Sequence, residues 1–149
     1  MKKLLRFLPV ALLALTVLSL SSCKDDKDEP FSYDKLPAAA KTFVSTYFSN
    51  TTVKSVKYDQ DDQEYEVYFN NGYDVTFNMA GEWTDVNSPE NKAIPDGIAP
   101  TPIVEFVEAL YPNVGIKEIS KESYGYAVEL VNGIDFKFNQ AGENIGVES

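Results

Sequence analysis

An internal repeat limits what this chain of 149 residues can fold into. Residues Tyr65–Trp83 (YEVYFNNGYDVTFNMAGEW) and Tyr126–Asn144 (YAVELVNGIDFKFNQAGEN) match without a gap at ten of nineteen positions. The matching positions are mostly turn formers and alternate apolar residues, which are the residues that shape a β-hairpin. The repeat therefore predicts architecture, and it carries little information about activity.

The spacing of apolar residues predicts the register of the first hairpin. Alternation on both sides of an Asn-Gly pair is typical of two half-buried strands. A two-residue loop would put the two apolar stripes on opposite faces of the sheet. A three-residue loop, Asn70–Gly72, pairs Phe69 with Tyr73 and puts both stripes on one face. We therefore expect a bulged loop with Gly72 in the left-handed region, and the same loop at Val131–Gly133.

A helix and a strand are predicted ahead of each hairpin. Residues 31–50 and 101–111 carry apolar side chains at helical spacing. Strands are expected at 52–59 and 116–121, and Gly81 and Gly142 mark a turn into one further strand in each copy. A lone helix-plus-four-strand unit of about fifty residues would bury too little surface to be stable. We therefore predict an α+β fold of two tandem α-β(4) repeats, residues 36–88 and 89–149, forming one compact domain. Its antiparallel sheet would be covered on one face by two helices.

The N-terminal residues 1–22 are predicted to be a secretory signal peptide, because a basic start precedes a short apolar stretch. Leu20-Ser21-Ser22-Cys23 resembles a bacterial lipobox, so Cys23, the only cysteine, is the predicted lipid attachment site. The alternative is an ordinary thiol after plain signal cleavage. Residues 23–35 are charged at their start and are predicted to be an acidic, disordered tether.

The tether also resembles the Lys/Asp-rich signal of surface-exported lipoproteins of the Bacteroidetes type. We therefore expect a cell-envelope lipoprotein at the outer membrane, exposed at the cell surface and held to the membrane through its lipid anchor only. The alternative is a solvated spacer that faces the periplasm.

Composition excludes several functions. From residue 23 onward the chain has ten lysines against twenty-three Asp and Glu, a net charge of −13, with no Arg and no His. Nucleic-acid binding needs a basic surface, so it is excluded. Without His, Ser-His and Cys-His catalysis and His-ligated zinc are also excluded. With Cys23 assigned to lipid, no thiol nucleophile remains, and we expect neither an enzyme nor a cofactor.

A family resemblance covers nearly all of residues 36–149. The motif that carries it is Leu36-Pro37, Phe43-Val44, Tyr65-x-Val67, Asn71-Gly72 and Phe77-Asn78-x-x-Gly81-Glu82-Trp83. It resembles the PepSY-like, β-lactamase-inhibitor-protein-like (BLIP-like) family of secreted Bacteroidetes lipoproteins. The resemblance implies a binding module related to protein inhibitors of hydrolases or proteases. The second copy departs from the motif, because Ala99-Pro100 replaces Leu36-Pro37 and Asn144 replaces Trp83.

Four residues are candidates for binding. Tyr68 and Glu66 should point away from the helix-covered face, and Glu129 occupies the position of Tyr68 in the second copy. Trp83 is the fourth, because Tyr and Trp are enriched in binding hot spots. The alternative is that Tyr68 stacks on its cross-strand neighbours and that Trp83 packs at the core edge.

Two acidic features give weaker functional hypotheses. Asp74 and Asp135 recur at the same hairpin position, but repeat symmetry alone need not bring them together for catalysis. The acidic run Asp59–Glu64 could bind calcium weakly, although it lacks the spacing and central Gly of an EF-hand, so a solvated loop is the simpler interpretation.

Two function classes follow from these observations. The first is a non-catalytic, lipid-anchored binding module of inhibitor-like type, with a protein partner. The alternative is a glycan- or small-ligand-binding accessory lipoprotein of the cell envelope.

Overall fold

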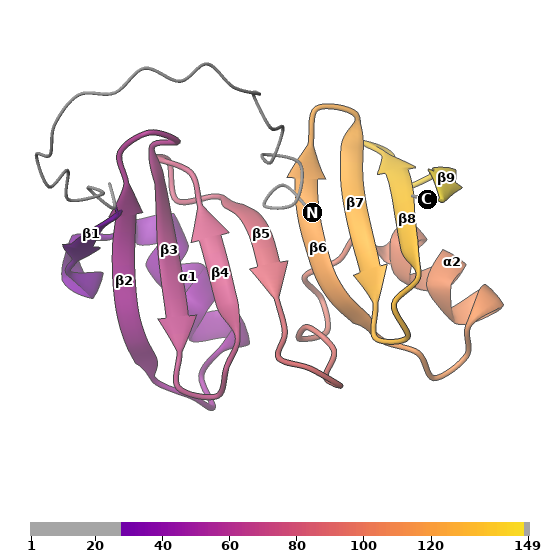
Figure 1. Cartoon of the computed structure of the whole chain (residues 1–149), viewed down its shortest axis with the longest axis horizontal. Coiled ribbons are helices and arrows are strands. Elements are labelled where there is room, and N and C mark those ends of the chain that lie inside the picture. The colour runs from indigo at the N-terminus through magenta and orange to yellow at the C-terminus, as the bar shows by residue number, and fades with distance from the viewer. Residues whose placement is uncertain (1–27, 148–149) are drawn as a thin grey trace, which may run out of the picture.

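A computed structural model describes residues 28–147 and shows one nine-stranded sheet in which every strand is antiparallel to its neighbours (Figure 1). The strands lie in the order of the sequence, so no connection crosses the sheet. They are β1 (Asp28–Phe31), β2 (Val53–Asp59), β3 (Glu64–Phe69), β4 (Asp74–Phe77), β5 (Trp83–Asn87), β6 (Ile116–Glu122), β7 (Gly125–Leu130), β8 (Asp135–Asn139) and β9 (Asn144–Val147). The helices are a short 3-10 helix, η1 (Tyr33–Lys35), and two α-helices, α1 (Ala38–Tyr47) and α2 (Thr101–Leu110).

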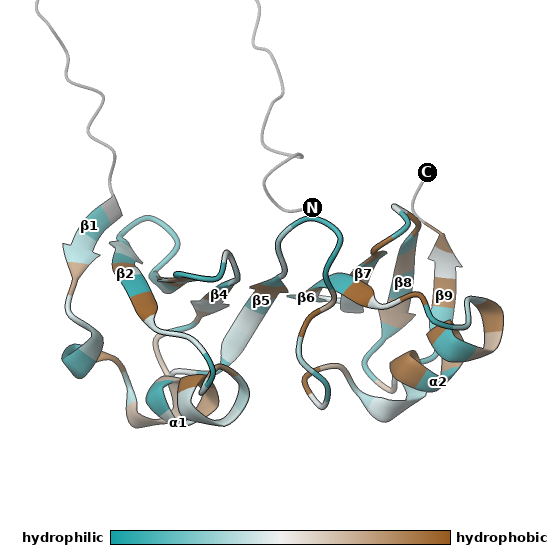
Figure 2. Cartoon of the chain, turned by 90° about the horizontal axis from the view of Figure 1, so that it is seen from below, coloured by the Kyte–Doolittle hydropathy of each residue, from teal (hydrophilic) through white to brown (hydrophobic). Residues whose placement is uncertain are grey.

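Both α-helices lie on the same face of the sheet (Figure 2). In the first repeat the Phe43 ring of α1 meets Phe77 of β4 edge-on, with ring centroids 5.5 Å apart. The second repeat makes the same contact between Phe106 and Phe138, at 5.3 Å. The alternate apolar residues of the strands are buried beneath the helices. The expected α+β architecture, with two helices covering one face, is confirmed.

The predicted hairpin loops are confirmed in both repeats. The Phe69 amide donates to the Tyr73 carbonyl at 2.9 Å, and Gly72 has φ of 92°. In the second repeat Leu130 bonds to Ile134 at 2.9 Å, and Gly133 has φ of 83°. The three-residue loop therefore brings both apolar stripes onto the helix-covered face.

The predicted tether is wrong for residues 28–35, which form β1 and η1. Phe31 is paired with Val56 of β2. Its ring lies 5.0 Å from that of Tyr65 and 6.1 Å from that of Tyr58. A single aromatic residue after a charged run thus gives the segment enough contact to extend the sheet. The predicted signal peptide, residues 23–27 and the predicted lipid site Cys23 lie outside the described residues.

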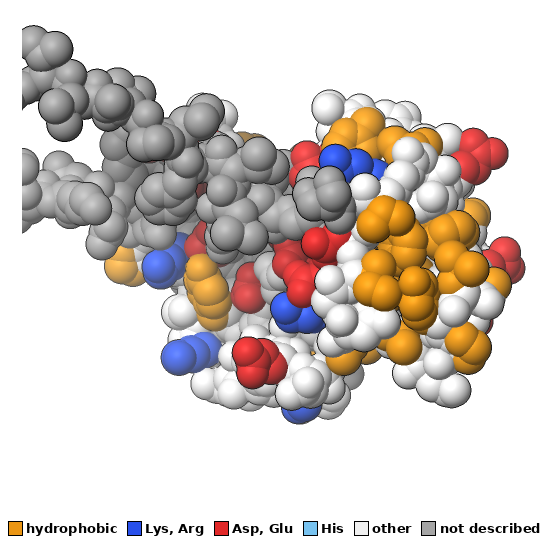
Figure 3. All heavy atoms as spheres, turned by 45° about the vertical axis from the view of Figure 1, so that its right-hand side comes forward, with side chains coloured by type: hydrophobic (Ala, Val, Ile, Leu, Met, Phe, Trp, Pro, Cys, Tyr) orange, Lys and Arg blue, Asp and Glu red, His pale blue; other side chains and the backbone are white. Residues whose placement is uncertain are grey.

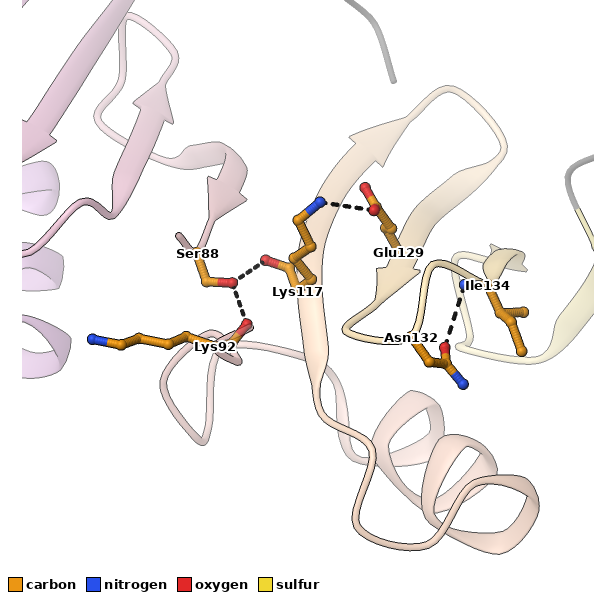
Figure 4. Close-up of polar contacts among 6 residues, drawn as sticks. All are labelled: Ser88, Lys92, Lys117, Glu129, Asn132 and Ile134. Atoms are coloured by element: carbon orange, nitrogen blue, oxygen red, sulfur yellow. Dashed lines mark hydrogen bonds and ion pairs between the residues drawn. The ribbon is translucent and has the colours of Figure 1, made fainter. Parts of the chain in front are cut away.

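The linker between the repeats, residues 88–100, is tied to the first strand of the second repeat (Figure 4). The buried Ser88 hydroxyl lies 2.5 Å from the carbonyl oxygen of Lys92 and 2.9 Å from that of Lys117. The linker also buries Ile94 and Ile98, each 6% exposed. Together with the pairing of β5 with β6, this packing makes the two repeats share one sheet and one core.

Candidate functional site

The face of the sheet opposite the helices carries two rows of side chains. Cross-strand pairs place these residues side by side from β2 to β8. The first row is Ser55, Tyr68, Asp74, Asn87, Glu118, Glu129 and Asp135. The second row is Lys57, Glu66, Thr76, Asp85, Ser120, Ala127 and Lys137. We call this surface the outer face. It contains more carboxylates than lysines and therefore favours a cationic or neutral partner.

The centre of the outer face is an amide held between carboxylates. Asn87 of β5 donates through Nδ2 to Asp74 Oδ2 at 3.2 Å and to Asp85 Oδ1 at 3.0 Å. Glu118 of β6 is paired with Asn87 in the next strand. The two repeats meet at this point, so residues that are far apart in sequence form one acidic surface. Figure 3 shows acidic side chains gathered in this middle part of the molecule.

The structure places Glu66 and Tyr68 together on the outer face, as the alternation of β3 predicts. Both are half-buried, and the Tyr68 hydroxyl donates to the Glu66 carboxylate. Lys57 of β2 lies with its ammonium 5.7 Å from the centre of the Tyr68 ring. The tyrosine is thus already ordered by an anion and a cation, and such pre-organisation lowers the entropic cost of binding through it.

Glu129 lies on the same face, four strands from Tyr68, and forms an ion pair. Lys117 Nζ is 2.8 Å from Glu129 Oε1 (Figure 4). The hydrogen bond that Lys117 donates to Glu129 raises the pKa of Lys117 above its ordinary value, against the opposing effect of burial, and the charges of Glu129, Glu118 and Glu90 raise it further. This cation stays charged at neutral pH and offsets part of the acidity of the outer face.

Trp83 lies on the opposite, helix-covered face. It is paired with Phe77, and a bulge in β5 around Thr84 sets that register. Its ring lies 6.4 Å from that of Tyr126, and the Lys121 ammonium is 4.3 Å from its centre. The indole is half-buried and packs against the core at the junction of the repeats. Trp83 therefore cannot share a binding surface with Tyr68, and its predicted binding role must be tested separately.

The geometry does not support the two weaker hypotheses, which are catalysis by Asp74 and Asp135 and calcium binding by the acidic loop Asp59–Glu64. Asp74 and Asp135 lie in one row on β4 and β8, which at the usual strand spacing are about 19 Å apart. In the acidic loop, Asp59 Oδ1 accepts hydrogen bonds from the backbone amides of Asp61 and Asp62, at 2.8 and 3.1 Å. Within residues 28–147, no group of three His, Cys, Asp or Glu is arranged to hold a metal ion.

A pocket of about 290 Å³ opens on the helix side, between the linker and α2. Apolar residues of the linker, α2 and the start of β6 form most of its wall, and Asp96 and Glu108 supply carboxylates. Sequence reasoning did not find this pocket, because the linker that forms one wall has no regular pattern.

Comparisons with known proteins show which family the chain resembles. A profile described as "Putative beta-lactamase-inhibitor-like, PepSY-like" matches residues 23–67 and 63–145. No curated protein matches significantly. In the described part of the chain, no helix is long and apolar enough to cross a membrane.

Three crystal structures of proteins from Bacteroides are similar over almost their whole length. A "putative periplasmic protein" of the DUF2874 family from Bacteroides vulgatus is 32% identical, with 84% of this chain and 99% of that chain covered and a TM-score of 0.78. A "putative calcium-regulated periplasmic protein" from Bacteroides thetaiotaomicron is 29% identical over 83% of this chain and 98% of that chain, also with a TM-score of 0.78. A second protein from Bacteroides vulgatus, described as periplasmic and of unknown function, is 28% identical, covers 82% and 99%, and has a TM-score of 0.75.

The profile spans both repeats, and the first of these crystal structures is similar over 84% of this chain with a TM-score of 0.78. The chain belongs to the PepSY-like, β-lactamase-inhibitor-like family.

Proposed function

We propose that this chain is a non-catalytic binding module of the cell envelope, held to the outer membrane by lipid on Cys23, and that it binds a protein partner through the outer face. The observation that carries the proposal is the continuous row from Tyr68 to Asp135, which crosses both repeats on the face opposite α1 and α2. A rigid, wide sheet surface suits a protein partner better than a small molecule. The family description favours a hydrolase, such as a β-lactamase or a peptidase, as that partner.

The negative charge of the outer face determines which partner surfaces it can bind. The acidic centre of the outer face around Asn87 attracts a cationic surface and repels an anionic one. Tyr68 supplies the aromatic anchor that such interfaces use as a hot spot. Binding should therefore weaken as salt rises, because the Debye length falls to about 8 Å at physiological ionic strength.

The test compares neutral, nearly isosteric variants of two acidic surfaces. A chain of residues 24–149 would be immobilised, and candidate β-lactamases and envelope peptidases would be passed over it. The outer-face variant carries Asp74→Asn, Asp85→Asn and Glu118→Gln. The control carries Asp61→Asn and Asp62→Asn in the acidic loop.

We expect binding to weaken at least tenfold in the outer-face variant and to persist in the control. Tyr68→Ala should cost about 2 kcal/mol of binding free energy if it is a hot spot. Circular dichroism checks that each variant is folded. Equal affinity of the outer-face variant and the unchanged chain would remove the outer face as the site, and loss of binding in the control alone would move the site to the acidic loop.

The lipid anchor has a separate test. Growth with a labelled fatty acid should label the wild-type chain and leave Cys23→Ser unlabelled, because no other cysteine is available. Equal labelling of both chains would refute lipid attachment at Cys23.

A second candidate, an accessory lipoprotein that binds a glycan or another small ligand, is supported by the pocket between the linker and α2. Its apolar wall and two carboxylates suit a small molecule with an apolar body and polar or cationic groups. Val104→Trp, which would fill the pocket, should abolish such binding while leaving protein binding through the outer face unchanged. The calcium regulation attributed to one relative can be checked by repeating both assays with and without calcium.

A further inference from the structure

The pocket between the linker and α2 can be compared with the corresponding place in the first repeat. Residues of the two repeats correspond when they are counted from the matching prolines, Pro37 and Pro100. Both helices then start alike, because the amides of Lys41 and Val104 each donate to the carbonyl of the matching proline at 3.2 Å. Val104 lines the pocket, so a lysine stands at this place in the first repeat.

The pocket exists where three side chains are smaller than their counterparts. Asp96, Ala99 and Val104 line it, and the corresponding residues are Tyr33, Leu36 and Lys41. In the first repeat Leu36 is 3% exposed within the core, and Tyr33 packs against that core. The smaller residues of the second repeat leave a space of about 290 Å³. This volume is at the lower end of the range for ligand pockets, so a small molecule fits it best.

The lysine of the first repeat shows which chemistry suits this place. The Lys41 ammonium donates a hydrogen bond of 3.1 Å to the Asp34 carbonyl in the turn before α1, and its side chain is half-buried. A lysine stem packs along apolar surface while its charged end meets polar groups. Gly97, which corresponds to Asp34, lines the pocket. An alkylammonium group therefore already occupies the equivalent place within the same chain.

The wall of the pocket supplies anions for such a cation. Asp96 and Glu108 are exposed and line it, and none of the described lysines does. Residues 88–116 contain four carboxylates and one lysine, namely Glu90, Asp96, Glu105, Glu108 and Lys92. The Lys92 side chain points away from α2, and the Lys117 ammonium pairs with Glu129 at 2.8 Å (Figure 4). The pocket is therefore anionic.

The floor of the pocket is apolar. Ile94 of the linker, Val107 of α2 and Ile116 of β6 line it, and each is at most 7% exposed. Because these residues come from three packed elements, the floor is fixed before a ligand arrives. It suits a hydrocarbon chain or an aromatic ring. A neutral sugar, which presents hydroxyl groups over most of its surface, matches this floor poorly.

We propose that this pocket binds a small primary amine with an apolar body, which lies on the floor and places its ammonium against Asp96 and Glu108. The inference rests on the second candidate function, a small-ligand site in this pocket, and it names the class of ligand. A hydrogen bond from an ammonium to a carboxylate is stronger than one between neutral groups. An alcohol or an acid with the same body lacks that attraction.

Three probes with one aromatic body test the class of ligand. They are 2-phenylethylamine, 2-phenylethanol and 3-phenylpropanoate, which are cationic, neutral and anionic at pH 7. Titration into isotopically labelled residues 24–149, followed by amide chemical shifts, measures each affinity and locates the site. We expect the amine to bind with a dissociation constant of about 1 mM, as is ordinary for so small a ligand, and to shift the amides of residues 93–97. The alcohol should bind at least fivefold more weakly, and the acid more weakly still.

Two variants change the pocket in different ways. Val104→Lys introduces the residue of the first repeat and should weaken amine binding at least tenfold, because its own stem and ammonium would occupy the site. Asp96→Asn combined with Glu108→Gln should lower the affinity for the amine to that for the alcohol and leave the alcohol unaffected. Asp61→Asn combined with Asp62→Asn, the matched control, removes two carboxylates from the acidic loop and should change none of the affinities.

Circular dichroism checks the fold, and if Val104→Lys is misfolded the pair of exposed carboxylates decides. A chain that binds none of the probes overturns the proposal. So does amine binding that survives both pocket variants or weakens equally in the acidic-loop control. Equal affinity for amine and alcohol, with both lost in Val104→Trp, would overturn the amine class while the second candidate function stands. Protein binding through the outer face should be unchanged in Val104→Lys, so its failure would be recognised separately.

Discussion

The two repeats have the same local structure, but corresponding residues in their last strands are buried to different extents. Val86 in the first repeat has 0% of its surface exposed, whereas Val147 at the same position in the second repeat has 63% exposed. Both are paired with a buried residue of the preceding strand, Val75 and Phe136 respectively. The difference comes from what lies on the other side, because β5 is followed by β6 and the linker while β9 is an edge strand. The repeat thus specifies a strand, and its neighbours decide whether that strand is core or surface.

Replacing each of these two valines by lysine gives the largest expected difference in the free energy of unfolding. Val86→Lys would bury an unpaired cation, and the expected loss of several kcal/mol is a large part of the roughly 5–15 kcal/mol by which a domain is stable. Val147→Lys should change the free energy of unfolding of the monomer by less than about 0.5 kcal/mol. Urea unfolding at low protein concentration, followed by circular dichroism, measures both. Similar values for the two variants would show that β9 is covered in solution.

Alanine substitutions at the turn glycines should show the next largest difference in stability between the repeats. A Cβ at Gly81 would lie 2.7 Å from Pro37 Cβ and 2.9 Å from the Ala40 backbone nitrogen, at the start of α1. A Cβ at Gly133 would meet nothing within 4 Å. Both residues have positive φ, 84° and 83°, so both alanine variants carry backbone strain of about 1 kcal/mol.

Gly81→Ala adds a steric overlap to that strain and should destabilise the chain by about 2 kcal/mol or more, whereas Gly133→Ala should cost only about 1 kcal/mol. Gly142→Ala is the matched case in the second repeat. Its Cβ would meet only side-chain atoms, at 3.0 Å or more, so its cost should lie between the other two. Thermal unfolding ranks the three variants, and a Gly133→Ala chain as unstable as Gly81→Ala would contradict the steric argument.

The third comparison concerns Trp83 and Asn144, which occupy corresponding positions in the two repeats. At this position the two repeats carry different residues. Replacing Trp83 by the residue of the second repeat, Trp83→Asn, removes its contacts with Tyr126 and Lys121. Because the indole is half-buried, we expect a loss of about 1–2 kcal/mol, less than for a fully buried aromatic residue. Denaturant unfolding by circular dichroism measures this loss. A Trp83→Asn chain of unchanged stability that loses a partner would instead support a binding role.

The hairpins could be predicted from the sequence because their register depends on residues only a few positions apart. The period-two pattern and the position of Gly72 sufficed for the loop at residues 70–72. The outer face could be predicted only in part. Its pairs Tyr68–Asp74 and Glu129–Asp135 follow from the two hairpin registers, but the central pair Asn87–Glu118 does not.

That central pair joins strands separated by a linker and α2, and the bulge in β5 shifts its register by one residue. No local pattern encodes such a shift. The same reason explains Trp83, because the bulge decides which face its side chain takes. The role of Phe31 in β1 was missed for a different reason, since a four-residue strand after a charged run has too few residues to show a period.

The smallest expected difference concerns the lysines at the first bulge of each repeat. Lys117 lies in the bulge of β6 and pairs with Glu129 at 2.8 Å, while the corresponding Lys54 of β2 is exposed and has Tyr68 at the position of Glu129. Solvent screens the Lys117–Glu129 pair, so a double-mutant cycle of Lys117→Met and Glu129→Gln should give a coupling below about 1 kcal/mol. Lys54→Met should leave the free energy of unfolding almost unchanged.

The pH dependence of this pair has a definite sign. The pKa of Lys117 is raised in the folded chain, chiefly by the hydrogen bond that its ammonium donates to Glu129. A lysine whose pKa rises on folding contributes its full stabilisation below the pKa of the unfolded chain, about 10.4, and loses it as the pH passes through the folded pKa. Stability at pH 9 should therefore exceed stability at pH 11 by more in the wild type than in Lys117→Met, because only the wild type loses the pair. Equal pH dependence of the two chains would mean that water already breaks the Lys117–Glu129 pair at neutral pH, and the two bulged lysines would then be equivalent.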